Sequence, residues 1–171
     1  AVGDTVRAWT AVAADQETGD DCGPWGYEVP FARSEAPGEA REGLQRALHV
    51  GALIGELGLH VLGIRRSGKS HRSVHEMVTP DRLHEMMRRA DFVLVAAPLT
   101  LETEGLINAS ALDCLRPEAG LINIGRARIV DYEALRQRLV DRRIRGAILD
   151  VFDPEPLPSD SPLWSTPNVI L

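Results

Sequence analysis

Two short apolar runs in the last third of the sequence most restrict what the chain can fold into. Residues 120–125 and 145–150 are strand-like, and a helical segment at residues 132–140 separates them. Strands that alternate with helices predict a parallel α/β sheet, whose ligands bind outside the carboxyl ends of the strands. Arg126 follows the first run and Glu155 follows the second. We therefore expect a cation and a carboxylate side by side at one edge of a sheet.

Further segments upstream and downstream extend the pattern. Apolar runs predict strands at residues 60–64 and 91–98, a last strand at 167–171, and helices at 80–89 and 109–115. Residues 39–58 carry apolar side chains at three- and four-residue spacing, which predicts a helix with one apolar face. Asp131 is placed to cap the helix at 132–140.

The polar residues after the two C-terminal runs form two spaced motifs. The pattern N-x-x-R-x-x-x-V-D spans residues 123–131, and D-V-F-x-x-E-P-L spans residues 150–157. Together they resemble the catalytic region of the D-isomer-specific 2-hydroxyacid dehydrogenases. Residues 91–108 are similar to the adenosine-side strand of that family and the helix after it. The resemblance covers residues 58–171 and implies a Rossmann-like parallel sheet with flanking helices.

The resemblance also implies roles for individual residues. Arg126 would hold the substrate carboxylate, a task that suits the planar guanidinium fork. Glu155 would hydrogen-bond the catalytic histidine of such an enzyme. The implied cofactor-binding residues after the strands are Pro98, Ile124, Gly125 and Asp150. Asp150 matches the aspartate that binds the nicotinamide carboxamide. The implied substrate is a small 2-keto or 2-hydroxy acid.

The residues after the strand at 60–64 bear on the choice of dinucleotide. In NAD-specific relatives an aspartate at this point binds the ribose hydroxyls, whereas a basic residue accommodates a 2′-phosphate. Arg65 holds that position here, and Arg66 and Lys69 are close to it in sequence. We therefore expect NADP to be favoured over NAD if a dinucleotide binds. The alternative is a solvated basic loop.

Two parts of the family pattern are not found. The glycines of G-x-G-x-x-G should fall at positions that hold Glu42, Leu44 and Ala47, and no continuous apolar strand precedes them. The sheet is therefore expected to be incomplete at its first strand. The family histidine would fall beyond Leu171, and none of the five histidines lies in its motif. We expect this segment alone to be inactive.

The N-terminal segment differs in charge from the rest of the chain. Residues 1–42 hold nine acidic and three basic residues, which accounts for the whole net charge of −6 (3 − 9 = −6). They predict an irregular acidic leader, with a short helix at Val6–Ala14. Gly23, Pro24 and Trp25 resemble part of a family arm that packs on a partner subunit, so the leader is either flexible or a homodimer contact. Residues 43–171 form the expected dinucleotide-binding domain, without a substrate domain.

Composition argues against several classes of function. Residues 43–171 carry sixteen acidic and sixteen basic residues, which does not suit a nucleic-acid surface. No run of about 18 apolar residues suggests a membrane span. Cys22 and Cys114 have no metal-site or disulfide spacing, and a cytoplasmic protein is expected. The histidines at 71, 75 and 84 lack carboxylates or cysteines at ligand spacing, so no metal site is expected.

Two functions from different classes therefore remain open. The first is an NAD(P)-dependent oxidoreductase of the D-2-hydroxyacid dehydrogenase or 2-ketoacid reductase type, represented by its cofactor-binding domain. The second is a non-catalytic binding or scaffold relative that has lost the phosphate loop. A different enzyme that uses Arg126 and Glu155 on a carboxylate ligand without a cofactor is a weaker third possibility.

Overall fold

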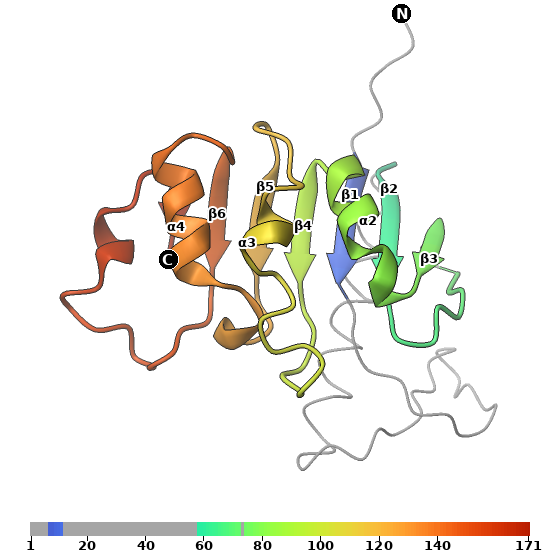
Figure 1. Cartoon of the computed structure of the whole chain (residues 1–171), viewed down its shortest axis with the longest axis horizontal. Helices are drawn as coiled ribbons and strands as arrows, with labels where there is room; N and C mark the ends of the chain where they lie inside the picture. The colour runs from blue at the N-terminus through green and yellow to red at the C-terminus, as the bar shows by residue number, and fades with distance from the viewer. Residues whose placement is uncertain (1–6, 12–57, 73) are drawn as a thin grey trace, which may run out of the picture.

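The computed structural model describes residues 7–11, 58–72 and 74–171, which form one sheet with helices against it (Figure 1). The seven strands pair in the order β3-β2-β1-β4-β5-β6-β7, and every pairing is parallel. The strands are β1 (Arg7–Ala11), β2 (His60–Ile64), β3 (Glu76–Val78), β4 (Phe92–Val95), β5 (Gly120–Asn123), β6 (Gly146–Leu149) and β7 (Val169–Ile170). This order confirms the expected Rossmann-like sheet.

Short helices connect the strands. The α-helices are α2 (Leu83–Arg89), α3 (Ala109–Leu112) and α4 (Tyr132–Val140), and the 3₁₀ turns are η1 (Pro80–Arg82), η2 (Ala127–Ile129) and η3 (Pro162–Ser165). The expected cap of α4 is confirmed, because the Asp131 carboxylate accepts a hydrogen bond from the Ala134 amide at 2.9 Å. Asn108 caps α3 in the same way, with the Ala111 amide at 3.0 Å.

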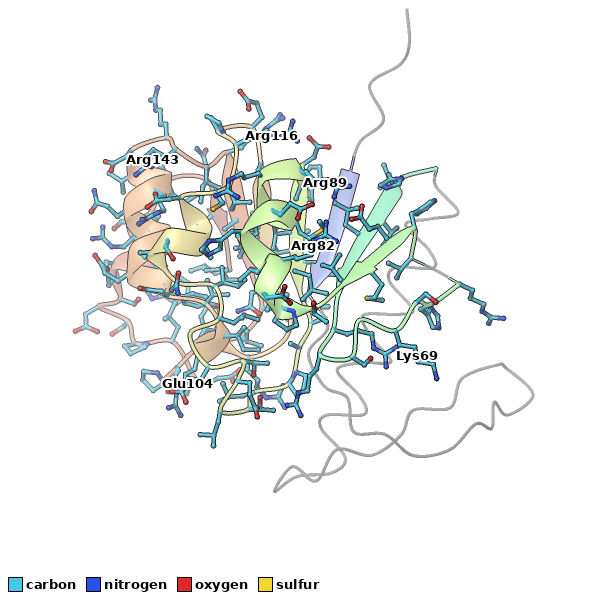
Figure 2. All side chains as sticks on the ribbon, turned by 45° about the vertical axis from the view of Figure 1, so that its right-hand side comes forward. Lys69, Arg82, Arg89, Glu104, Arg116 and Arg143 are labelled. Carbon is cyan, nitrogen blue, oxygen red and sulfur yellow. The ribbon has the colours of Figure 1, made fainter. Side chains whose placement is uncertain are left out.

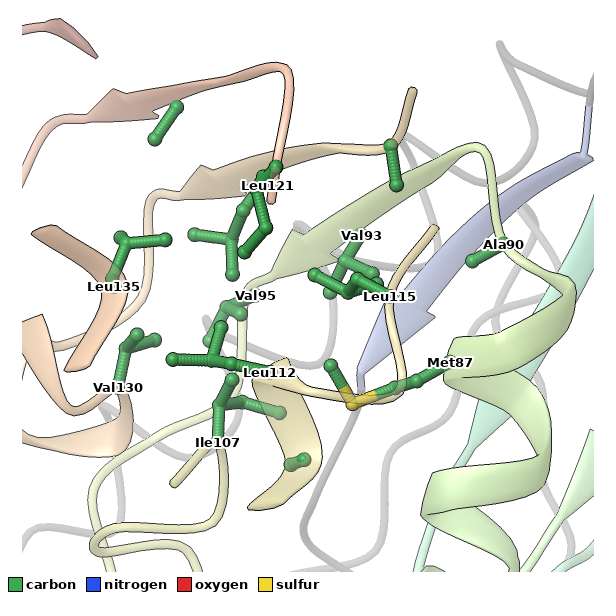
Figure 3. Packing of buried hydrophobic residues seen from close by; sticks show 14 of the residues in the cluster. Met87, Ala90, Val93, Val95, Ile107, Leu112, Leu115, Leu121, Val130 and Leu135 are labelled. Atoms are coloured by element: carbon green, nitrogen blue, oxygen red, sulfur yellow. The ribbon is translucent and has the colours of Figure 1, made fainter. Parts of the chain in front are cut away.

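The core lies between the sheet and the layer of α2, α3 and α4, which cover the same face (Figure 1). Figure 3 shows Val93, Val95 and Leu121 of the central strands packed against Leu112 and Leu135 of the helices. All five side chains are buried. Because β4 and β5 each have a parallel neighbour on both sides, their apolar runs are nearly continuous, as expected for interior strands.

Two expectations for the N-terminal segment were wrong, because residues 7–11 form strand β1. Residues 7–11 were expected to lie in a short helix, and the sheet was expected to lack its first strand. Instead Arg7–Ala11 pairs with β2 on one side and with β4 on the other. Two parallel neighbours satisfy the backbone groups of this segment on both sides, and such tertiary pairing overrides a weak helical pattern. The strand was missed because it lies far upstream of the position that family spacing indicated.

The remaining expectations for the N-terminal part lie outside the described residues. They concern the acidic leader, its boundary with the domain at residues 42 and 43, the helix at 39–58, and the residues Gly23, Pro24, Trp25, Glu42, Leu44 and Ala47. These stay predictions. Among the residues that are described, the edge strand β3 was not expected, because Glu76–Val78 lies in a polar stretch of sequence. No helix in the described part of the chain is long and apolar enough to cross a membrane.

Candidate functional site

The candidate site is the edge of the sheet at which the parallel strands end, the lower edge in Figure 1. The strand order reverses between β1 and β4, and ligands of open α/β sheets bind at such a reversal. Figure 2 shows Lys69 and Glu104 at this edge, and Arg116 and Arg143 at the opposite one. Every predicted site residue follows β2, β4, β5 or β6, so all of them belong to the same edge.

Arg126 leaves β5 in an extended conformation and precedes η2. Its backbone has φ −138° and ψ 141°, and its side chain is half-buried. One terminal guanidinium nitrogen donates to the Gly125 carbonyl at 3.0 Å. The guanidinium is a planar group with five N–H donors. Arg126 follows Asn123, the last residue of β5, by three positions and therefore lies at the carboxyl edge of the sheet.

The buried Asn123 side chain holds the Arg126 segment in place. Asn123 has no exposed surface, and its amide nitrogen donates to the Arg126 carbonyl at 3.2 Å and to the Tyr132 hydroxyl at 3.0 Å. Its amide oxygen accepts from the Gly125 amide at 3.0 Å. The Asn123 side chain therefore satisfies three polar groups in a turn that has no regular backbone hydrogen bonds. These three bonds order the turn.

Tyr132 extends this network to the next strand. Its hydroxyl accepts from Asn123 and donates to the Val151 carbonyl at 2.8 Å. Burial raises the pKa of the phenol well above its usual value, an effect larger than the opposing effect of the Asn123 hydrogen bond. The phenol is therefore a neutral donor that joins the segments after β5 and β6. Sequence reasoning treated Tyr132 only as the start of a helix, although its position directly after the helix cap was a usable signal.

Gly125 brings the turn after β5 against the end of β4. A Cβ atom at Gly125 would lie 2.8 Å from the Ala97 carbonyl oxygen and 3.3 Å from the Ala97 nitrogen. The neighbouring Ile124 amide donates to the Val95 carbonyl at 3.0 Å. Pro98 is buried, and its carbonyl accepts from the Thr103 hydroxyl at 2.7 Å. The structure thus brings the predicted cofactor-binding residues Pro98, Ile124 and Gly125 into one packed region.

Asp150 and Glu155 follow β6 on the same edge. The Asp150 amide donates to the Asn123 carbonyl at 3.0 Å, and both acidic side chains are exposed. The segment that contains Glu155 is tied to η2, because Arg128 lies 3.7 Å from Asp153 and also forms an ion pair with Glu104. The structure therefore places Arg126 and Glu155 on segments that are linked to each other. Their catalytic roles stay predictions.

The basic residues after β2 are separated by β1 from the site residues that follow β4, β5 and β6. Arg65 is buried, and its guanidinium donates to the Lys69 carbonyl at 3.3 Å. Arg66 is exposed, and its guanidinium lies 3.3 Å from the Glu102 carboxylate. Burial and the positive charges of Arg72 and Arg65 lower the pKa of His71, which keeps this loop from gaining a further cation at neutral pH. Of the two predicted arginines, Arg66 presents its guanidinium to solvent.

The residues present fit a dinucleotide better than a metal ion. Gly125 lies where an added side chain would meet backbone, and Arg66 offers an exposed cation at the end of β2. The close approach at Gly125 is between two segments of the protein, whereas the exposed guanidinium of Arg66 suits contact with an anionic group of a dinucleotide. Among residues 58–72 and 74–171, no three His, Cys, Asp or Glu side chains are grouped so that they could hold a metal ion.

Comparisons with known proteins agree with this geometry. Residues 47–171 match the model of the D-isomer specific 2-hydroxyacid dehydrogenase, NAD binding domain. A glyoxylate/hydroxypyruvate reductase B from Pectobacterium carotovorum is 49% identical over 88 residues, which are 52% of this chain and 28% of that protein. The chain therefore spans much less than two thirds of the length of this relative.

Two solved structures have a fold similar to that of this chain. The D-isomer specific 2-hydroxyacid dehydrogenase from Xanthobacter autotrophicus Py2 has a TM-score of 0.74 at 28% identity, covering 96% of this chain and 45% of that one. A second structure from the same organism, in complex with NADPH and MES, has a TM-score of 0.66 at 31% identity, covering 96% of this chain and 56% of that one.

Proposed function

Because the chain belongs to the D-isomer specific 2-hydroxyacid dehydrogenase family, we propose that it is the dinucleotide-binding part of an NAD(P)-dependent oxidoreductase that acts on small 2-keto or 2-hydroxy acids. The observation that carries this proposal is the edge where Arg126, Asp150 and Glu155 follow neighbouring strands. The names of the relatives favour a substrate of the size of glyoxylate or hydroxypyruvate.

Each residue has a definite task in the proposed reaction. A bound nicotinamide supplies the hydride, or accepts it in the oxidative direction. Arg126 would make a forked contact with the substrate carboxylate, and the Asn123 network holds its backbone. Asp150 would bind the carboxamide, which fixes the face of the ring. Glu155 would accept a hydrogen bond from a catalytic histidine and keep that side chain oriented and protonated.

The same proposal includes a preference for NADP. Arg66 presents an exposed guanidinium at the end of β2, where the adenosine ribose of a dinucleotide lies in such sheets. Two structural neighbours were solved with NADPH or NADP, which supports this choice. Homodimerisation and a cytoplasmic location also stay predictions, and the molar mass in solution tests the first of them.

Calorimetric titration with NADPH and with NADH tests the proposal. We expect tighter binding of NADPH, because Arg66 can form a charge-assisted hydrogen bond to the 2′-phosphate. Arg66→Gln should weaken NADPH binding about 10-fold or more, since such bonds contribute about 1.5–3 kcal/mol, and should leave NADH binding nearly unchanged. Arg143→Gln is the matched control, because this arginine lies at the opposite edge of the sheet (Figure 2). Tighter binding of NADH would refute the cofactor preference.

Turnover in a protein that includes this chain tests the assignment of Arg126. Arg126→Lys keeps the charge but removes the planar fork, so we expect a raised KM for glyoxylate or hydroxypyruvate and a lower kcat/KM. Arg136→Lys is the control, because Arg136 pairs with Glu133 within α4 and not with a residue of the strand ends. An equal effect of the two substitutions on KM would contradict the role of Arg126.

One expectation from the sequence favours the alternative function. Family spacing counted back from Gly58 places the phosphate-binding glycines at positions that hold Glu42, Leu44 and Ala47, although the first strand of the sheet ends at Ala11. A side chain in place of the second glycine would stand where the backbone must approach the pyrophosphate. A non-catalytic scaffold with this sequence would give no heat with either dinucleotide. The titration described above therefore separates the two functions without any assay of catalysis.

A further inference from the structure

We propose that the Glu102 carboxylate competes with the 2′-phosphate of a dinucleotide for the guanidinium of Arg66. This competition sets how strongly the site discriminates between dinucleotides with and without a 2′-phosphate. This inference rests on the proposed binding of a dinucleotide. Arg66 follows β2, Glu102 lies in the loop after β4, and their charged groups are 3.3 Å apart. Because β1 lies between β2 and β4, the ion pair joins the two sides of the point where the strand order reverses.

The Glu102 carboxylate is held in this place by its own loop. The oxygen that faces Arg66 also accepts a hydrogen bond from the Thr100 hydroxyl at 2.8 Å. Thr103 fixes the loop in turn, because its hydroxyl accepts from the Thr100 amide and donates to the Pro98 carbonyl, both at 2.7 Å. The hydrogen bonds of its own loop therefore place the carboxylate against Arg66.

The charge state of Glu102 suits this role. The hydrogen bond from Thr100, a backbone hydrogen bond and the positive charge of Arg66 lower the pKa of Glu102 below its usual value. The group is thus ionised at neutral pH. A phosphate that approaches Arg66 meets a carboxylate of like charge, and the guanidinium must exchange one anionic partner for another.

Solvent exposure allows this exchange. The side chains of Arg66 and Glu102 are 43% and 64% exposed, and ion pairs of such exposure are weak. A dianionic phosphate has more charge and more acceptor oxygens than a carboxylate, so it can displace Glu102 from the guanidinium. An unphosphorylated ribose has no anion to exchange. Glu102 consequently reduces the affinity for NADPH and leaves that for NADH almost unaffected.

The test is a titration of Glu102→Gln with NADPH and NADH at low salt. The substitution keeps the shape of the side chain and an oxygen that can accept from Thr100, so the loop should be preserved. We expect NADPH to bind about two- to five-fold more tightly, the range typical of an exposed ion pair, and NADH to change by less than about 1.5-fold. The gain should shrink at high salt, because screening weakens the competition.

Two further variants isolate the interaction. Glu104→Gln removes the same charge from the same loop but from a residue that pairs with Arg128, so it should give little or no gain. In an Arg66→Gln background, Glu102→Gln should have no effect on NADPH, because the group for which it competes is gone.

Several outcomes would overturn the inference. These are weaker NADPH binding by Glu102→Gln, an equal gain for NADH, an equal gain from Glu104→Gln, or a gain that persists without Arg66. Unchanged binding in Glu102→Gln, while the unmodified protein binds NADPH well, would overturn the role of Glu102 and leave the proposed function standing. An unmodified protein that binds neither dinucleotide would overturn both.

Discussion

Replacement of Tyr132 by phenylalanine tests the network that joins the segments after β5 and β6. The substitution removes only the hydroxyl, which accepts from Asn123 at 3.0 Å and donates to the Val151 carbonyl at 2.8 Å. The Asn123 amide nitrogen keeps its bond to the Arg126 carbonyl, whereas the Val151 carbonyl loses this donor. The chemical change is thus two hydrogen bonds with no change in ring volume.

The expected cost follows from these contacts. A hydrogen bond in a folded protein contributes about 1 kcal/mol, and a buried group left without its partner costs about 1–3 kcal/mol. With Asn123 fully buried and Tyr132 mostly buried, we expect a loss of about 2 kcal/mol in the free energy of unfolding. For a chain of this size, that loss lowers Tm by about 4–8 °C.

Urea unfolding and thermal unfolding measure this loss directly. Ser165→Ala is the control, because it removes an exposed hydroxyl whose hydrogen bond to the Pro162 carbonyl is 3.2 Å long. We expect that control to change stability by less than about 0.5 kcal/mol. A Tyr132→Phe loss that is no larger than the control loss would refute the view that the network orders this edge of the sheet.

Three further predictions concern the same region. Burial raises the pKa of Tyr132 in the native state, so this phenol contributes its full stabilisation below the usual phenol pKa of about 10. Above that pH, the free energy of unfolding should fall by about 1.4 kcal/mol per pH unit. Urea unfolding at increasing alkaline pH should therefore show a steeper fall of the midpoint for the unmodified protein than for Tyr132→Phe. Gly125→Ala should lower the free energy of unfolding by about 1–3 kcal/mol, because the added Cβ meets backbone atoms. Gly120→Ala should cost less, because its Cβ meets an exposed ring that can move, and thermal unfolding compares the two variants. Asp131→Ala should cost about 1 kcal/mol through loss of the helix cap, while Asp141→Ala, past the end of α4, should cost much less in the same measurement.

The local pattern of the sequence was sufficient to predict the elements of the C-terminal half of the sheet. Apolar runs, an intervening helix and the cap at Asp131 predicted β5, α4 and β6 in order. Because parallel strands end at one edge, the placement of Arg126 and Glu155 on that edge followed from the order of elements alone. These features depend on neighbours that are close in sequence, which is why a single sequence could reveal them.

Only the tertiary structure decided the features that depend on distant partners. Strand β1 has a weak pattern of its own and is a strand because β2 and β4, which follow it by about fifty to eighty residues in the chain, supply its hydrogen bonds. The link from Tyr132 to Val151 and the ion pair between Arg66 and Glu102 likewise join separate strand ends. Periodicity and motif spacing carry no information about which strand ends meet, because that depends on how the whole sheet is assembled.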